Sequence, residues 1–390
     1  VFRNVKLRGL SNTILSIDAN FASNLGALNY LETGFGFLAA SNTAINATTL
    51  TFTTAANAGN VKTGDKLVVK GTDTSSNEDV EFFHRATADG NAGTGVVTID
   101  SKVAKALTSV TIQIFGGTNN TSSAMNNSIE NLTIKANSSQ SVVTTAVIHA
   151  TRHENLLIKN VKFLGFTTTN YATPVDMSEC LNCTVDRVSI EGSYAGGIRF
   201  NLSYGCDVLF CNVYNSATNL STIGAILIRD SYEASVIDCT VFYCQASVDA
   251  ILIDASSRRC FVSDNHVSKA LSYGIGSAGR DNVITGNLLE ANTNGGIYNP
   301  GQYNVLSNND IHFGDVGIQL LSTSVGNVVT GNQISRVIDY GIYAPSSSNL
   351  IVGNTFTLGT GGSPAILSSG TNNHMTGNMI TNWTGVGISL

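Results

Sequence analysis

A six-residue motif recurs between residues 282 and 390 as NVITGN, NVLSNN, NVVTGN, NLIVGN and NHMTGN. The closing asparagines are Asn287, Asn309, Asn332, Asn354 and Asn378, at spacings of 22, 23, 22 and 24 residues. Each copy is followed by a Gly-Ile or Ala-Ile pair, such as Gly296-Ile297. A short period of β-type segments is typical of a solenoid in which each repeat is one coil. One coil cannot bury its apolar face alone, so the coils must stack around a common core.

Longer versions of this repeat fill the chain from Asn126 onward. Each has a strand A, a strand B after a variable connection, and a third short strand before the next strand A, such as the VIT of 283–285. The predicted inward residues of strand A are Leu132, Val161, Val188, Val213, Val241, Val267, Leu289, Ile311, Ile334, Phe356 and Ile380. Those of strand B are Val147, Val175, Ile198, Ile226, Ile251, Ile275, Ile297, Ile318, Ile342, Ile366 and Ile388. Coils of about 22–29 residues with three strands predict an all-β fold, a parallel β-helix.

The same periodicity places two kinds of polar residue. The closing asparagines are expected to form a ladder at a bend, where Asn tolerates a left-handed backbone and its amide bonds to the next coil. This ladder comprises Asn265, Asn287, Asn309, Asn332, Asn354 and Asn378. His149 is expected to face the core, because it lies two residues after the predicted inward residue Val147.

The repeat is interrupted near the start of the chain. Residues 1–20 look like one coil, with Asn4-Val5-Lys6-Leu7 followed by TILSIDA. After it the period is lost, and turn signals separate the strand-like runs TLTFTT, KLVVKG, DVEFFH, GVVTID and SVTIQIF. We therefore predict a first β-helix coil at 1–20, an inserted all-β domain at 21–125 and the parallel β-helix at 126–390.

Composition narrows the classes of function. The net charge of −6 predicts no nucleic-acid partner, and no apolar run approaches the roughly 20 residues that a membrane-spanning helix needs. All seven cysteines lie between Cys180 and Cys260 without a zinc-like spacing, which predicts buried, reduced thiols and a reducing compartment. No metal or cofactor is expected. The chain starts and stops within strand-like runs, so it is expected to be part of a longer protein.

The N-x-[VIL]-x-G-N motif with its Gly-Ile pair resembles the repeats of the right-handed parallel β-helix proteins of the pectate-lyase-like superfamily. The catalytic motifs of polygalacturonases and pectate lyases are missing from the sequence. An early insertion before a long Ser-, Thr- and Asn-rich β-helix resembles the tailspikes of tailed bacteriophages. The resemblance implies a homotrimer of the virion tail, assembled in the host cytoplasm, that attaches to bacterial surface polysaccharide and often cleaves it.

Glycoside hydrolysis needs two carboxyl groups, about 5 Å apart for retention and about 6.5–9.5 Å apart for inversion. Neighbouring coils are about 4.8 Å apart and same-face residues of a strand about 6.8 Å apart, so acids one coil and one such step apart are separated by about 8 Å. Acids two coils apart in one column are separated by about 9.6 Å. Outward-facing acids in these relations are the candidates for catalysis.

The first candidate cluster lies on the outward face of the early strands B. Its catalytic candidates are Asp176, Glu179 and Asp230, and its substrate-binding candidates are Arg199, Arg229 and Asp254. Glu179 and Asp230 occupy one column, two coils apart. Long A-to-B connections at 164–174 and 214–225 are expected to wall a groove beside it. The alternative is a ladder of ion pairs, Asp176 with Arg199 and Arg229 with Asp254.

The second candidate cluster lies on the outward face of strand A. Its catalytic candidates are Glu290 and Asp310, whose mutual crowding is expected to raise the pKa of one acid toward that of a general acid. Its substrate-binding candidates are His266, His312, Tyr214 and Phe242, with the two aromatic rings suited to stack on sugars. The alternatives are a solvated acidic face and an aromatic seam between subunits.

The leading prediction is a phage tailspike that depolymerises capsule, O-antigen or exopolysaccharide by endo-acting glycoside hydrolysis. The first cluster is favoured because the long connections adjoin it. A polysaccharide lyase on the same fold and a non-enzymatic receptor-binding fibre or adhesin are the alternatives. A secreted, extracellular carbohydrate-modifying enzyme such as an epimerase is a further one.

Overall fold

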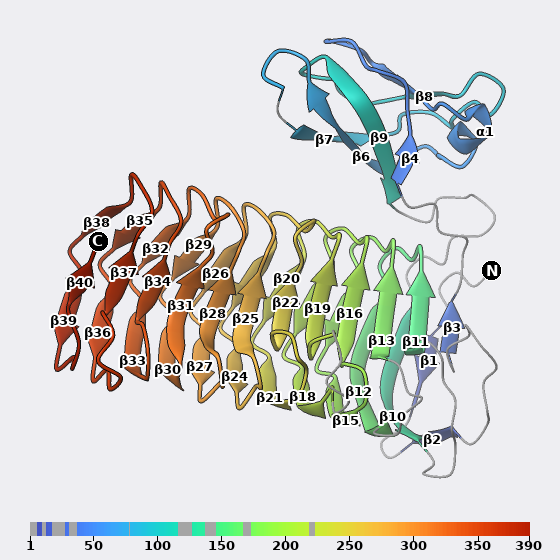
Figure 1. Cartoon of the computed structure of the whole chain (residues 1–390). Coiled ribbons are helices and arrows are strands. Elements are labelled where there is room, and N and C mark those ends of the chain that lie inside the picture. Colours follow the sequence, from blue (N-terminus) through green and yellow to red (C-terminus); the bar gives the residue numbers. More distant parts are fainter. Residues whose placement is uncertain are drawn as a thin grey trace.

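The computed structural model describes residues 6–9, 13–17, 28–30, 37–77, 79–115, 127–136, 146–166, 173–217 and 223–390. A sheet of 22 strands and a sheet of 12 strands, both parallel, run the length of an elongated solenoid (Figure 1). Every strand in them pairs with the equivalent strand of the neighbouring coil. The predicted all-β parallel β-helix is confirmed.

Strand A and the third strand, which we call strand C, share the larger sheet. The A strands are β2 (Ile14–Ile17), β15 (Ser189–Ser193), β18 (Asn212–Ser216), β21 (Thr240–Cys244), β24 (His266–Ser268), β27 (Leu288–Glu290), β30 (Asp310–Gly314), β33 (Gln333–Val337), β36 (Thr355–Thr357) and β39 (Met379–Thr381). The C strands are β1 (Lys6–Arg8), β14 (Thr184–Asp186), β17 (Asp207–Leu209), β20 (Ser235–Ile237), β23 (Phe261–Ser263), β26 (Val283–Thr285), β29 (Val305–Ser307), β32 (Val328–Thr330), β35 (Leu350–Val352) and β38 (His374–Thr376). In two early coils C and A are one continuous strand, β10 (Ser128–Ala136) and β12 (Leu157–Phe166).

Strand B alone forms the smaller sheet. Its members are β3 (Leu28–Tyr30), β11 (Ala146–Thr151), β13 (Thr173–Ser178), β16 (Ile198–Asn201), β19 (Ile226–Arg229), β22 (Ile251–Ile253), β25 (Tyr273–Ser277), β28 (Gly295–Asn299), β31 (Val316–Leu320), β34 (Ile342–Ala344), β37 (Ile366–Ser368) and β40 (Ile388–Ser389). Strands β1 and β2 pair with β10, and β3 pairs with β11. The first coil therefore contains all three strands and reaches Tyr30.

The observed register corrects the predicted one at two places. In strand B, Val175 pairs with Ile148 and not with Val147, so His149 faces outward beside Asp176. The sequence offers two adjacent apolar residues there, and only the pairing decides between them. In strand A, Val213 pairs with Ile190, which displaces the predicted residues Leu132, Val161 and Val188 by two positions. A shift of two keeps the side chains on the same face, so they remain buried.

The core of the solenoid is aliphatic and is bordered by polar ladders at the corners. The predicted closing asparagines do stack: Asn287 Nδ2 donates to Asn309 Oδ1 at 2.9 Å, and Asn309 Nδ2 donates to Asn332 Oδ1 at 2.9 Å. The left-handed residue is the one before each of them, such as Gly286 with φ of 69°. A second ladder, which the sequence analysis did not identify, joins the opening asparagines Asn282, Asn304, Asn327, Asn349 and Asn373.

Cysteines replace asparagine at these corners in the earlier coils. Asn265 Oδ1 accepts the N–H of Cys239, and Cys239 Sγ accepts the N–H of Cys211 at 3.4 Å. All seven cysteines are free and buried, as predicted. Burial raises the pKa of the Cys260 thiol to about 12, which makes a nucleophilic role for it unfavourable. The thiols act as small core groups that accept backbone N–H groups.

The inserted segment forms an antiparallel sheet with the order β4-β9-β6-β7 and a separate pair, β5 with β8. These elements are β4 (Phe37–Ala39), β5 (Thr49–Thr51), α1 (Ala55–Ala58), β6 (Lys66–Asp73), β7 (Asp79–Arg85), β8 (Val96–Thr98) and β9 (Leu107–Phe115). The sheet has its own apolar core, which includes Leu67, Val69, Ile112 and Ile114. It lies beside one edge of the solenoid (Figure 1).

The inserted sheet docks on the corner between strands B and C. Val68 and Phe83 pack against Leu181, Tyr204 and Tyr232 of successive coils. The Phe83 ring centroid lies 5.7 Å from that of Tyr204 and 5.6 Å from that of Tyr232. Because two inserted strands supply these contacts, the insertion covers part of the B-to-C corner and shapes the surface next to it.

Candidate functional site

The first predicted cluster begins with a tight ion pair on the outward face of β13 and β16. Arg199 Nε donates to Asp176 Oδ1 at 2.8 Å, and its Nη2 donates to Asp176 Oδ2. His149 Nε2 lies 3.8 Å from the same Oδ2. Asp176 is only 1% exposed, so both of its oxygens are committed to this contact. The predicted ion pair is present, and Asp176 acts in it as a fixed carboxylate.

His149 is a member of this group that the sequence analysis assigned to the core. Its imidazole is partly buried against Asp176 and Arg199, and that burial lowers its pKa. The lowered pKa favours the neutral ring at neutral pH. His149 therefore extends the outward column of β11, β13 and β16 without adding a charge.

The other predicted acids of this cluster lie at the B-to-C corner. Glu179 and Asp230 both have left-handed backbones, with φ of 54° and 47°, and occupy one column two coils apart. Glu179 is buried, whereas Arg229 Nε lies 3.6 Å from Asp230 Oδ2. Asp254 Oδ1 accepts the N–H of Asp230 at 3.0 Å and the Ser257 hydroxyl at 2.8 Å. The predicted partner of Arg229 is thus replaced by Asp230, because Asp254 caps the turn.

The expected walls of this cluster fall partly outside the described residues. Positions 167–172 of the 164–174 connection and 218–222 of the 214–225 connection belong to the part of the chain that the structure does not describe.

The second predicted cluster is an open group of acids and histidines on β24, β27 and β30. His266 Nε2 lies 2.9 Å from Glu290 Oε2, and His312 Nε2 lies 2.7 Å from Asp310 Oδ1. His312 Nδ1 also lies 2.6 Å from Ser335 Oγ. The side chains are 42%, 40%, 44% and 27% exposed for His266, Glu290, Asp310 and His312. All four can therefore contact a ligand from solvent.

The register fixes the relation between the two acids of this cluster. Leu288 pairs with Asp310 and Glu290 pairs with His312, so Glu290 and Asp310 are one coil and one same-face step apart. That relation corresponds to about 8 Å between the two positions. Each acid has an imidazole as its nearest titratable neighbour, whereas the other carboxyl group was expected from the sequence.

Aromatic side chains continue this face toward the first coils. Tyr214 and Phe242 occupy the column of Glu290, and their ring centroids are 6.5 Å apart. Lys269 Nζ lies 5.0 Å from the centroid of the Phe242 ring. A cleft of about 430 Å³ flanks the cluster where strand A ends, and Tyr243, Lys269, Leu271 and Ala291 line it. The structure thus brings together acids, imidazoles, aromatic rings and a cleft on one side of the solenoid.

One unusual acid of the outward B face was not predicted. Asp249 is buried, and burial raises its pKa to about 6. It lies near Tyr273, whose ring stacks on that of Tyr298 with centroids 5.3 Å apart. Asp249 precedes β22 in an A-to-B connection, where strand parity gives no direction for a side chain. Only the excess of Tyr beside strands B, at 273, 298, 340 and 343, signals this surface in the sequence.

The described residues lack two further features. They contain no group of three or more His, Cys, Asp and Glu residues close enough to hold a metal ion. Among the same residues, no helix has the length and apolar character needed to cross a membrane.

The fold and its outward faces define this chain as a right-handed parallel β-helix protein. Residues 249–390 match the family described as the right-handed β-helix region. A comparison with curated protein sequences gave no match. The resemblance drawn from the repeat is therefore confirmed as a resemblance of fold.

Solved structures with this fold include phage tailspikes. The chain is similar to tailspike gp61 of Pseudomonas phage phi297, with a TM-score of 0.57 and 11% identity over 96% of this chain and 63% of that chain. It is also similar to tailspike gp49 of Pseudomonas phage LKA1, with a TM-score of 0.58 and 14% identity over 96% of this chain and 67% of that one. The chain thus spans about two thirds of each tailspike.

A bacterial surface protein is equally similar. PfbA, a surface adhesin of Streptococcus pneumoniae, gives a TM-score of 0.57 at 13% identity, over 68% of this chain and 82% of that chain. Identities this low show a shared fold and leave the activity to be argued from the site.

Proposed function

We propose that this protein is a tailspike that binds bacterial surface polysaccharide and cleaves it by hydrolysis. The observation that supports this most is the open cluster on strand A, where Glu290 and Asp310 alternate with His266 and His312. Similarity in fold to two phage tailspikes over almost the whole chain supports the same class. A location in the virion tail is part of this proposal.

The spacing of the acids favours an inverting mechanism. Glycosidases that invert the anomeric centre hold their carboxyl groups about 6.5–9.5 Å apart, which leaves room for a water molecule. The strand register puts Glu290 and Asp310 one coil and one same-face step apart, which corresponds to about 8 Å. One acid protonates the leaving oxygen, and the other removes a proton from the attacking water. His312 contacts both Asp310 and Ser335, so it orients Asp310, to which we assign the role of base.

Two aromatic residues of strand A bind the chain of sugars. Tyr214 and Phe242 present rings in the column that includes Glu290, and aromatic faces pack well on the apolar faces of sugars. The flanking cleft offers room for units beyond the bond that is cleaved. This arrangement suits an extended polysaccharide that lies along the solenoid axis and is cut internally.

Substitution of the two acids tests the assignment. We expect Glu290→Gln and Asp310→Asn each to lower turnover by about a hundredfold or more, because each removes one acid–base group, while binding of the polysaccharide is retained. Azide should partly restore Asp310→Asn, since a small anion can replace the activated water. The matched control is Glu191→Gln, an exposed acid in the same outward column that pairs with Lys162. Full activity in both acid variants would refute the assignment.

Glu179 and Asp230 are the second candidate pair for the same reaction. They are about 9.6 Å apart in one column, near the limit for inversion. Glu179 is buried and Asp230 contacts Arg229, so this pair is less accessible than the strand A pair. Loss of turnover in Asp230→Asn with full activity in Glu290→Gln would move the site to this corner.

A non-enzymatic adhesin is the second candidate function. It is favoured by the similarity to the pneumococcal surface adhesin, whose TM-score equals that of the first tailspike. In that case the strand A cluster binds sugar without cleaving it. Binding of polysaccharide without new chain ends would support the adhesin, and an unsaturated product would support a lyase.

We also propose that the protein is a homotrimer. Phe313, Ile338 and Leu358 are exposed along the A-to-B edge of the late coils and line an apolar cleft of about 570 Å³. Large apolar patches on a soluble protein are often covered by a partner. Native mass spectrometry should show three copies, and a monomer at micromolar concentration would contradict this assembly.

A further inference from the structure

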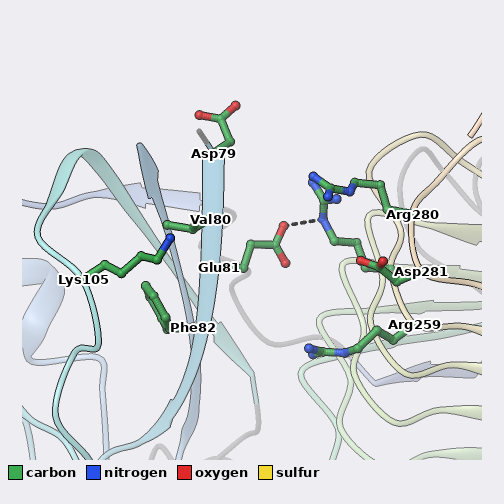
Figure 2. A pocket seen from close by; sticks show the side chains of 9 residues that line it. Asp79, Val80, Glu81, Phe82, Lys105, Arg259, Arg280 and Asp281 are labelled. Carbon is green, nitrogen blue, oxygen red and sulfur yellow. Dashed lines mark hydrogen bonds and ion pairs between the residues drawn. The ribbon is translucent and has the colours of Figure 1, made fainter. Parts of the chain in front are cut away.

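A cleft of about 280 Å³ separates the inserted sheet from the B-to-C corner of the solenoid. Strand β7 forms one wall, and successive corners of the solenoid form the other (Figure 2). Backbone bridges join Arg258 to Arg280, which places these two arginines on adjacent coils. Arg259 follows Arg258 with a left-handed backbone, with φ of 53°. Three guanidinium groups therefore line the same wall.

The carboxylates that line the cleft are Asp79 and Glu81 of the inserted sheet and Asp281, which follows Arg280 on the solenoid wall. Glu81 extends from β7 toward the arginines (Figure 2). Arg258 Nε donates a hydrogen bond to Glu81 Oε1. Lys70 Nζ also lies 3.8 Å from Glu81. The negative charge of Glu81 is thus already balanced by these two cations. Asp79, on the same strand, accepts a hydrogen bond from Thr72 Oγ1 at 3.1 Å and points away from the arginines in Figure 2.

Arg259 is partly neutralised, whereas Arg280 is not. Arg259 Nη2 lies 3.3 Å from Glu233 Oε1, and its guanidinium lies 4.0 Å from the Phe83 ring centroid. Arg280 forms no ion pair with the described residues, and its buried Nε has no hydrogen-bond partner among them. A buried donor without a partner is unfavourable, and more so when it is charged. Because Arg280 lines the cleft without an ion pair to the described residues, its guanidinium is the least neutralised of the three for a ligand to bind.

The surroundings of Arg280 suit a sugar. Its guanidinium lies 5.0 Å from the ring centroid of Tyr303, whose side chain is exposed. A planar guanidinium binds a carboxylate through two parallel hydrogen bonds. An exposed aromatic ring beside it offers a surface for the sugar ring that bears the carboxylate.

We propose that this cleft binds a hexuronate unit of an acidic polysaccharide, with Arg280 as the main ligand of its carboxylate and Tyr303 beneath the ring. The inference rests on the proposed function and adds a substrate class to it. Because the cleft lies between the inserted sheet and the solenoid, a bound uronate contacts both. The insertion thus contributes to recognition of the polysaccharide away from the strand A cluster.

Calorimetry on the full chain tests this site with defined probes. We expect tetragalacturonate to bind, maltotetraose not to bind, and inorganic phosphate to compete only weakly. Arg280→Gln should weaken binding of tetragalacturonate by about tenfold or more, since a charge-assisted contact is lost. Arg280→Lys keeps the positive charge but cannot form the two parallel hydrogen bonds of a guanidinium. It should therefore lose an intermediate amount of affinity for tetragalacturonate. An unchanged melting temperature will show that each variant is folded.

Arg187→Gln is the matched control, because the Arg187 guanidinium lies 5.1 Å from the ring centroid of Phe210, an equivalent arginine–aromatic contact away from the cleft. It should bind tetragalacturonate as the native chain does. Equal binding by Arg280→Gln, or equal binding of the neutral probe, would overturn the proposal, and strong competition by phosphate would reduce it to a general anion site. Cleavage of a neutral polysaccharide without binding of tetragalacturonate would refute only this inference. A chain that binds tetragalacturonate but cleaves nothing refutes only the hydrolase.

Discussion

Asp249 shows how strongly a single environment can act on a carboxyl group in this solenoid. Its Oδ1 accepts hydrogen bonds from Ser272 Oγ at 2.9 Å and from the Tyr273 N–H at 3.3 Å. A Cβ at Gly276 would lie 2.0 Å from Asp249 Oδ2, so only glycine fits beneath it. Burial is the dominant effect and raises the pKa of Asp249 to about 6.

The raised pKa predicts a pH-dependent stability. An ordinary Asp has a pKa of 3.8, so between that value and about 6 the folded chain holds a proton that the unfolded chain has lost. The free energy of unfolding therefore falls as pH rises through this interval, by up to about 3 kcal/mol. Asp249→Asn should match the native chain at about pH 4 and exceed its melting temperature at about pH 8.

Asp264→Asn serves as the control for this pH series, because Asp264 is exposed at a corner of the same region. Loss of this exposed charge should change the melting temperature little. A constant difference between Asp249→Asn and the native chain would show that Asp249 has an ordinary pKa.

At this scale the sequence predicts the face on which a residue lies better than its contacts. The alternation of side chains along a strand placed Glu290 and Asp310 outward, and both are exposed there. It could not show that each acid has a histidine beside it, because side-chain rotamers decide that. It failed at His149, where Val147 and Ile148 are both apolar, and at Asp249, which lies in a connection without strand parity.

At the scale of elements, the corners between strands are where the repeated sequence motif has its structural role. The closing asparagine of each hexad is buried and bonded to the next coil, while the preceding residue takes the left-handed turn. This division of labour explains why glycine so often precedes the asparagine. The sequence predicted the ladder, but it could not assign the left-handed position, since Asn and Gly both tolerate that backbone.

Removal of one ladder residue should destabilise the solenoid. Asn309 Nδ2 donates to Ile284 O at 3.1 Å, and Asn309 Oδ1 accepts the N–H of Asn287 at 3.1 Å. Asn309→Ala leaves these buried groups without partners, so we expect a loss of about 3 kcal/mol or more in the free energy of unfolding. Urea denaturation measures this loss.

The neighbouring residue provides the control for the ladder. Asn308 has φ of 54° at the position that Gly331 and Gly353 occupy in later coils, so Asn308→Gly should be close to neutral. Equal stability of Asn309→Ala and the native chain would show that the ladder contributes little.

At the scale of the whole molecule, the periodic part was predictable and the contacts of the insertion were not. A fixed period determines a solenoid, and the apolar residues of each strand identify its core. The docking of Phe83 between Tyr204 and Tyr232 joins segments more than a hundred residues apart in the sequence. No local sequence pattern predicts this contact. The cleft with Arg280 follows from that docking, so it also lay beyond the sequence.

At the same scale, our proposals give the molecule two recognition surfaces with different roles. We assign cleavage to the open cluster on strand A and recognition of an acidic sugar to the cleft between the insertion and the solenoid. Because the two surfaces are separate, a long polysaccharide chain is the ligand class that suits this proposal. A small metabolite would not need two separated surfaces.

The formation of new chain ends from bacterial surface polysaccharide tests the central proposal most directly. The full chain is incubated with purified capsular polysaccharides and O-antigens from a panel of strains, and reducing ends and unsaturated uronate are both measured over time. The account predicts that at least one polysaccharide gains reducing ends without unsaturated product, and that Glu290→Gln abolishes the gain. A polysaccharide that the protein binds and leaves at full length would contradict it.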